Sequence, residues 1–191
     1  MVDKYGPRWF LIFGPAIVAV GLLLLSFVKQ TNGPSSYWTT FLPGIFLFGL
    51  GMSFTVTPLT TTVMGAVAGH YSGTASGINN AISRISNVFA NAIIGALAIL
   101  FFTGFLNSRI KKISLREELK TQVVAQAANL GDAKVPSSVD GENKTKIEQD
   151  YKDGFIETYS KVMRICAALA ALSALMAFIF IKNEELKKGN K

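Results

Sequence analysis

Charged side chains are almost missing from the first half of this 191-residue chain. Residues 1–108 hold five of the 31 Asp, Glu, Lys and Arg residues, and residues 30–83 hold none. Water-soluble domains do not normally contain so long an uncharged stretch, because their surfaces need polar side chains to face water. Half of the residues are hydrophobic and the mean hydropathy is +0.36. This composition excludes a soluble enzyme, a disordered chain and a small disulfide-stabilised secreted domain.

Residues that carry catalytic or metal chemistry are also scarce. The one cysteine, Cys166, lies in an apolar run without an intrachain disulfide partner, and the one histidine, His70, stands alone. The common hydrolase, metalloprotease and nucleotide-binding motifs are missing, and no two carboxylates share an apolar segment. We therefore expect no enzyme activity, no metal and no cofactor. The net charge of +7 does not favour nucleic acid as a partner, because the cations flank apolar blocks instead of clustering.

Four apolar segments are long enough to cross a membrane. A bilayer core about 30 Å thick needs about 20 helical residues, and only helices or closed barrels satisfy their backbone hydrogen bonds in lipid. Long alternating strands are missing, so helices are favoured over a barrel. A cleaved signal peptide is the alternative for the first segment, although its uncharged stretch is longer than a typical signal core. The spans are predicted at about residues 9–28, 38–67, 74–106 and 159–182.

Residues 107–158 form the one extended polar segment, with nine basic and nine acidic side chains between its ends. Ser114 and Glu117 match a capping box at a helix start. Apolar residues then recur at helical spacing in two stretches, 115–130 and 147–155, separated by turn-forming residues. We expect a helical hairpin that leads into the last span. A solvated, partly ordered linker is the alternative.

The third predicted span has one polar face. Its polar residues are spaced four, four, three and four apart, which places them within about 80° around a helix. An Arg in the middle of a membrane helix costs about 2.5–3.5 kcal/mol, so this face should line a bundle interior or a wet cavity. Alternatively, the amides bond to neighbouring helices and Arg84 reaches the headgroups. The residues of this face, the polar seam, are Ser76, Asn80, Arg84, Asn87 and Asn91.

The second predicted span contains Pro58, whose ring removes one backbone hydrogen bond and bends a helix. Thr55 and the hydroxyl residues near it would either line a path or bond to freed backbone carbonyls. Glycines recur every four residues from position 65 to position 77. We predict a turn around His70 and then a packing ridge that starts at Gly73 and includes Gly77. Pro58 and these glycines are the candidate hinge and packing residues.

Two segments resemble a known family. Residues 58–64, PLTTTVM, and residues 73–84, GTASGINNAISR, closely resemble a late signature in the C-terminal half of the fourteen-span drug:proton antiporters of the major facilitator superfamily. Residues 3–8, DKYGPR, resemble the short cytoplasmic D-R-x-G-x-R loop that precedes a span in the same half. Asn80 and Arg84 match the signature position by position. Together with the polar loop before a final span, the resemblance covers nearly the whole chain.

The resemblance implies an all-α membrane protein whose four transmembrane helices belong to a major-facilitator C-terminal helix bundle. These would be the last four spans of a transporter, with the N-terminal half missing. The second and third spans would line the central cavity, and the substrates would be small amphipathic molecules or drugs exported against protons. The implied location is a plasma membrane, in bacteria the cytoplasmic membrane, with the lipid bilayer as surroundings.

Orientation involves a conflict. The resemblance implies a cytoplasmic tail at residues 183–191 and an extracytoplasmic loop at 107–158. The Lys and Arg near the ends of that loop favour the opposite orientation. We favour the resemblance, because earlier helices can fix the topology and the loop is neutral overall.

The chain also departs from the family pattern. Asn87, Val88 and Asn91 stand where many relatives have glycines, which adds polarity to the seam and disfavours close packing there. Membrane carboxylates for proton coupling are absent and would lie in the missing half. The competing hypothesis is a stand-alone four-span membrane protein that acts as an interaction or regulatory subunit, with the glycine ridge and the polar hairpin as contact surfaces.

Overall fold

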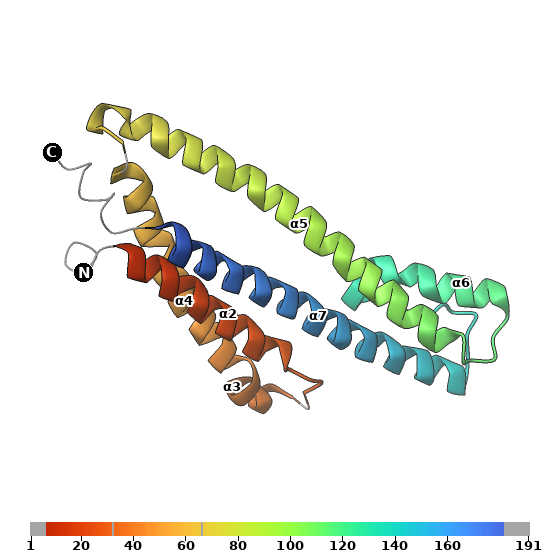
Figure 1. The fold of residues 1–191 in the computed structure, drawn as a ribbon. Helices are drawn as coiled ribbons and strands as arrows, with labels where there is room; N and C mark the ends of the chain where they lie inside the picture. The colour runs from red at the N-terminus through yellow and green to blue at the C-terminus, as the bar shows by residue number, and fades with distance from the viewer. Residues whose placement is uncertain (1–6, 32, 66, 182–191) are drawn as a thin grey trace.

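A computed structural model describes residues 7–31, 33–65 and 67–181 (Figure 1). Within these residues the chain is helical and has no strand, which confirms the expected all-α class. Four of the described helices are long and apolar enough to cross a membrane. Most of the predicted cytoplasmic loop at residues 3–8, and the tail at 183–191, lie outside the described residues. The long helices are α2 (Pro7–Ser26), α4 (Leu42–Gly65), α5 (Ser72–Ile110) and α7 (Glu142–Phe180).

Short helical elements join the long ones. The turn predicted around His70 is the 3-10 helix η2, and Tyr71 then begins α5 as its N-cap residue. The polar segment is helical over much of its length, and its last part is continuous with the last span in α7. The short elements are η1 (Pro34–Ser36), α3 (Tyr37–Thr40), η2 (Gly69–Tyr71), α6 (Glu117–Ala125) and η3 (Gln126–Asp132).

Helix α2 packs closely against α4 along a line of glycines. A Cβ atom on Gly21 would lie 2.7 Å from the backbone nitrogen of Phe48, and one on Gly51 would lie 2.6 Å from that of Val18. Only glycine permits backbones to approach so closely, as small residues do in membrane helix pairs. The buried residues of α4 are Gly44, Gly51 and Pro58, seven apart, so they form a single face toward α2.

Helix α7 runs antiparallel along the other side of α2. Arg8 Nη2 at the start of α2 donates a hydrogen bond to the Phe178 carbonyl oxygen, 3.2 Å away in the last turn of α7. At the opposite end, Gln149 Nε2 donates to Gln30 Oε1 at 3.3 Å. Helices α2, α4 and α7 therefore form the packed part of the bundle (Figure 1).

Helix α5 meets α7 only near its own C-terminal end. A Cβ atom on Gly154 would lie 2.6 Å from Phe105 Cδ1 and 2.8 Å from Phe102 Cε2, so these helices cross at close range there. Toward its N-terminus α5 runs apart from α2 and α7 (Figure 1). Residues 81–93 of α5 are all exposed.

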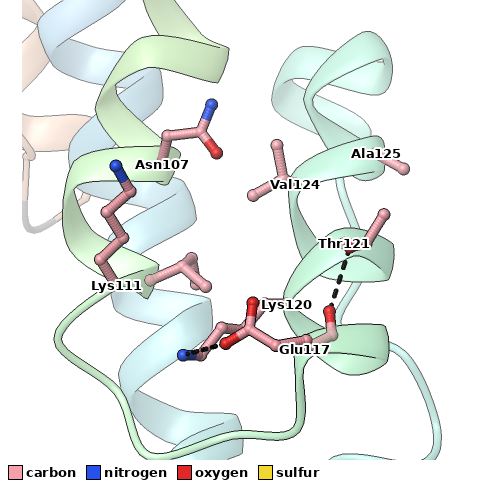
Figure 2. A pocket seen from close by; sticks show the side chains of 8 residues that line it. Asn107, Lys111, Glu117, Lys120, Thr121, Val124 and Ala125 are labelled. Carbon is pink, nitrogen blue, oxygen red and sulfur yellow. Dashed lines mark hydrogen bonds and ion pairs between the residues drawn. The ribbon is translucent and has the colours of Figure 1, made fainter.

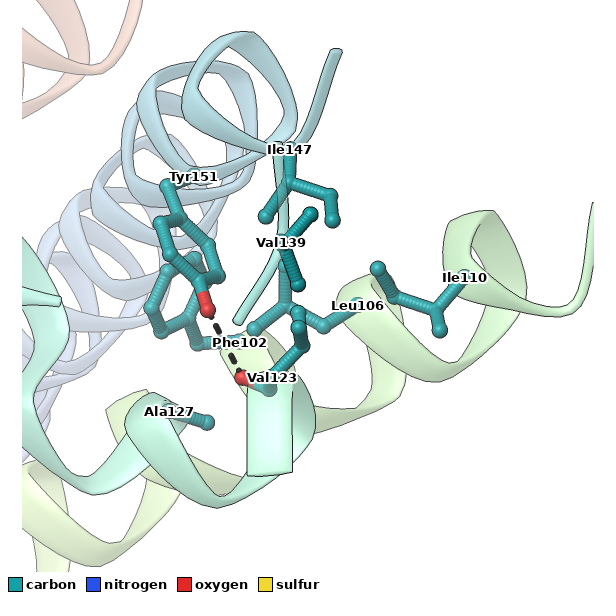
Figure 3. Close-up of a cluster of buried hydrophobic side chains, with 8 residues drawn as sticks. All are labelled: Phe102, Leu106, Ile110, Val123, Ala127, Val139, Ile147 and Tyr151. Carbon is teal, nitrogen blue, oxygen red and sulfur yellow. Dashed lines mark hydrogen bonds between the residues drawn. The ribbon is translucent and has the colours of Figure 1, made fainter. Parts of the chain in front are cut away.

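The residues between α5 and α7, 111–141, fold back as a cap with its own apolar core (Figure 3). Tyr151 Oη donates a buried hydrogen bond to the Val123 carbonyl oxygen at 2.9 Å. Desolvation raises the pKa of Tyr151, which precedes the predicted span, to about 12. The fully or largely buried core residues are Phe102, Leu106, Ile110, Val123, Ala127, Val139, Ile147 and Tyr151.

The predicted capping box is wrong in detail. Arg116, in an extended conformation, is the N-cap of α6, and no side chain caps this helix start. Ile113 and Leu115 pack against the cap core, and this contact leaves Ser114 in the connection before the helix. The helix also ends earlier than its apolar spacing indicates, because η3 continues from Gln126 as a tighter helix.

Candidate functional site

The polar seam lies on the part of α5 that the other described residues leave uncovered. Asn80, Arg84, Asn87 and Asn91 are exposed, and Ser76 is half-buried. At a rise of about 1.5 Å per residue the seam is about 22 Å long, which is most of the apolar thickness of a bilayer. One continuous helix thus positions all five side chains on one face.

Few interactions satisfy the polar groups of the seam. Asn91 Nδ2 donates to Asn87 Oδ1 at 3.3 Å, one helical turn away. None of the ion pairs among the described residues involves Arg84. The sequence has no Asp or Glu in residues 4–116 or 158–183, so the apolar parts of the four spans cannot supply a carboxylate. The counter-charge of the Arg84 guanidinium must therefore come from groups outside the apolar parts of these four spans.

The opposite face of α5 is apolar and equally uncovered. Ile85 and Phe89 are 59% and 64% exposed, and each lies about 160° around the helix from the seam residue two positions later. Apolar side chains are stable against lipid, whereas Arg and Asn are not. The two faces therefore demand different surroundings. The exposed apolar residues are Ile78, Ile82, Ile85, Phe89 and Ile93.

Thr55 lies apart from the seam. Its hydroxyl donates to the Gly51 carbonyl oxygen at 2.8 Å, and the Thr55 side chain is the nearest group to the position of a Cβ on Gly14. Thr55 therefore belongs to the contact between α4 and α2. The hydroxyls of Ser53, Thr60 and Thr61 also donate to carbonyl oxygens four residues earlier, as Thr62 does to Pro58 at 2.7 Å. None of these bonds reaches the Phe54 carbonyl, which is the one that Pro58 leaves without an N–H partner.

The candidate hinge and packing residues also lie in different surroundings. Pro58 is buried in the α4 face toward α2. No atom of a neighbouring helix in the described residues lies within 4 Å of a Cβ position on Gly73 or Gly77. The close-packing glycines of this chain are others, which the sequence reasoning missed. Their signal is a spacing of seven residues, at Gly14 and Gly21 in α2 and at Gly44 and Gly51 in α4.

A pocket of about 380 Å³ lies away from the seam, between the end of α5 and α6. Figure 2 shows Asn107 of α5 and Lys111, which follows that helix, on one side and Thr121 of α6 on the other. Lys120 Nζ lies 2.9 Å from Glu117 Oε1 at its rim. In the described part of the chain, no cluster of three or more His, Cys, Asp and Glu side chains could hold a metal ion.

Comparison with known proteins places these helices in a family. The family model for the Major Facilitator Superfamily matches residues 1–106. The chain is 25% identical to multidrug resistance protein Stp of Mycobacterium tuberculosis over 132 residues, which are 68% of this chain and 24% of that protein. It is 36% identical to agnestins efflux protein AgnL12 of Paecilomyces divaricatus over 63 residues, 33% of this chain and 13% of that protein.

The chain therefore spans about a quarter or less of the length of these curated relatives. No solved structure matches it significantly. The family match covers α2, α4 and most of α5, including the whole polar seam. The chain belongs to the Major Facilitator Superfamily.

Proposed function

We propose that this chain forms the last four spans of a secondary active transporter that exports small amphipathic molecules or drugs in exchange for protons. The family match, and the names of two relatives that denote multidrug resistance and efflux, support a transporter of this class. The share of each relative that the chain covers supports a larger whole protein. A mycobacterial relative favours the bacterial cytoplasmic membrane as its location.

The observation that carries the proposal is the uncovered polar seam of α5. A helix with Arg84 and three exposed Asn on one face is stable in a membrane only when that face meets water or polar groups. The missing part of the bundle would supply those surroundings, with a substrate path between the two. Arg84 would then act as a fixed cation that orients an anionic or hydrogen-bond-accepting group of the substrate.

Proton coupling requires a titratable group within the membrane. Because residues 4–116 and 158–183, which hold the apolar parts of all four spans, contain no Asp or Glu, we infer that this group belongs to the rest of the transporter. In this division of roles, the seam binds substrate and a carboxylate outside this chain exchanges the proton. The cap, residues 111–141, then lies on the extracytoplasmic side, and the beginning of α2 and the end of α7 lie on the cytoplasmic side.

Replacing Arg84 tests this proposal. Arg84→Ala, made in the complete reading frame, should lower export of a fluorescent substrate about tenfold or more at an unchanged amount of protein in the membrane. The matched control is Lys144→Gln, which removes one exposed cation at the far end of α7. Unchanged export and unchanged substrate affinity in Arg84→Ala would contradict the anchor role.

A second candidate is a four-span protein that regulates a partner. The observation in its favour is that α2, α4, α7 and the cap pack well within this chain alone. Translating the genomic DNA upstream of Met1 separates the candidates. Ten further in-frame spans upstream support the transporter. An in-frame stop codon and a ribosome-binding site just upstream of Met1 support the four-span regulatory protein.

A further inference from the structure

A groove of about 720 Å³ lies where the end of α2 meets the middle of α7. The α2 side of the groove consists of Ser26, the last residue of that helix, and of residues 27–30, which follow it. The α7 side carries the last charged residues before the apolar run that begins at Ile165. Both sides change from charged to apolar at the same level, so the groove lies at the surface of the membrane.

The described residues supply no ionic partner for two cations of the groove. Lys161 is paired with Glu157 at 2.7 Å, and Asp153 accepts a hydrogen bond from Gln149 at 2.9 Å. Among the ion pairs of the described residues, none includes Lys29 or Arg164. These two exposed cations line the same groove, Lys29 from the segment after α2 and Arg164 from α7. The lining holds three cations and two carboxylates, so the net charge of the groove is positive.

The groove also has an apolar side. Phe27 is 66% exposed, and the Arg164 guanidinium carbon lies 5.7 Å from the centroid of its ring. Ile156 of α7 lines the groove as well. A ligand that fits needs an anionic group for Lys29 and Arg164 and an adjoining apolar chain for Phe27. At the membrane surface, a phospholipid combines these two features.

We propose that this groove binds the headgroup of an anionic phospholipid. Its phosphate lies between Lys29 and Arg164, and the first part of its acyl chains lies against Phe27. Basic pockets between membrane helices bind anionic lipid headgroups in the same way, with cationic side chains placed at the membrane surface. A bound lipid would join the end of α2 to α7 at the level where the cap begins. This proposal does not depend on the transport function or on the polar seam.

The full chain in nanodiscs tests the proposal. The discs contain phosphatidylcholine with a minor fraction of phosphatidylglycerol, and native mass spectrometry counts the lipids that stay bound after release. The wild-type chain should retain phosphatidylglycerol in preference to phosphatidylcholine. In the double variant Lys29→Gln with Arg164→Gln, the preference for phosphatidylglycerol should fall roughly tenfold. Two cations near an anionic lipid together contribute an attraction of about this size.

Two further variants keep the test specific. Lys144→Gln with Lys152→Gln removes the same charge from exposed positions outside the groove and should retain the lipid. Lys29→Arg with Arg164→Lys keeps both charges and should also retain it. Retention of phosphatidylglycerol by the Lys29→Gln and Arg164→Gln variant, or loss of it from the control pair, would overturn the proposal. Displacement of the lipid by excess inorganic phosphate would assign the groove to a free anion instead.

Discussion

Arg8 of α2 donates a hydrogen bond to the carbonyl oxygen of Phe178, 170 residues later in the last turn of α7. The same guanidinium lies 5.8 Å from the centroid of the Phe178 ring. The last carbonyls of a helix have no partner within it, and a cation there also interacts favourably with the helix dipole. Arg8 therefore connects the start of α2 to the end of α7, at the end of the bundle that we assign to the cytoplasmic side.

Removing this contact should weaken the bundle. Arg8→Gln is expected to lower the free energy of unfolding by about 0.5–1.5 kcal/mol, measured by thermal unfolding in detergent. Arg84→Gln is the matched control, because Arg84 is exposed and has no ion pair in the described residues. Equal melting temperatures of the two variants would show that the Arg8 contact contributes nothing.

The contact between α2 and α4 depends on the absence of side chains. Gly51→Ala places a methyl group 2.6 Å from the Val18 backbone nitrogen and 2.8 Å from the Gly14 carbonyl oxygen, so the helices must separate. We expect a loss of about 1–3 kcal/mol in unfolding experiments. Gly49→Ala, in the same helix, meets nothing within 4 Å and should stabilise the chain slightly through helix propensity. A Gly51→Ala protein as stable as Gly49→Ala would refute this packing.

The cap should depend on Tyr151. Tyr151→Phe removes the donor to the Val123 carbonyl oxygen and should cost about 1 kcal/mol, seen as faster amide hydrogen exchange in α6 and η3. Exchange in α2 should not change, because α2 lies outside the cap core. Unchanged exchange in α6 would mean that apolar packing alone holds the cap.

The raised pKa of Tyr151 gives the cap a pH dependence. Its pKa rises from 10.0 to about 12 because burial disfavours the charged phenolate. The unfolded chain would ionise first, so the stability that this group contributes is complete below pH 10 and falls as the pH rises toward about 12. Relative to the base-catalysed intrinsic exchange rate, the protection of the α6 amides should fall across this range in the wild type and much less in Tyr151→Phe. Parallel pH profiles would contradict this link.

The all-α class and the shared helical face of the seam residues can be predicted from the sequence, because they depend only on composition and on one helical period. Asn80, Arg84 and Asn87 share a face in any straight helix, and α5 is continuous over all of them. The absence of charged side chains from residues 30–83 likewise indicates membrane-spanning helices, whichever helices pack together. These features need no knowledge of which helix neighbours which.

Other features depend on tertiary contacts and escaped prediction. Thr55 faces α2 because Gly14 lets α2 approach it, and a single helix pattern does not show its neighbour. Ser114 is not the N-cap residue of α6, because Ile113 and Leu115 on either side of it pack against the apolar core of residues 111–141. The four-residue glycine spacing near Gly73 matches the common small-residue packing motif of membrane helices, but no neighbouring helix among the described residues meets it. The close contact between α2 and α4 uses glycines seven residues apart.

The proposed function requires that the seam of α5 faces a water-accessible path while its opposite face meets lipid. Cys166→Ser removes the one cysteine and allows single cysteines to be placed at matched depths. Asn87→Cys pairs with Ile85→Cys, and Asn91→Cys pairs with Phe89→Cys, each about 160° apart around the helix.

Labelling these cysteines in native membranes with a membrane-impermeant maleimide is the most direct measurement. The claim predicts rapid labelling at positions 87 and 91 and little at 85 and 89. Equal labelling within both pairs, or faster labelling at 85 and 89, would contradict it.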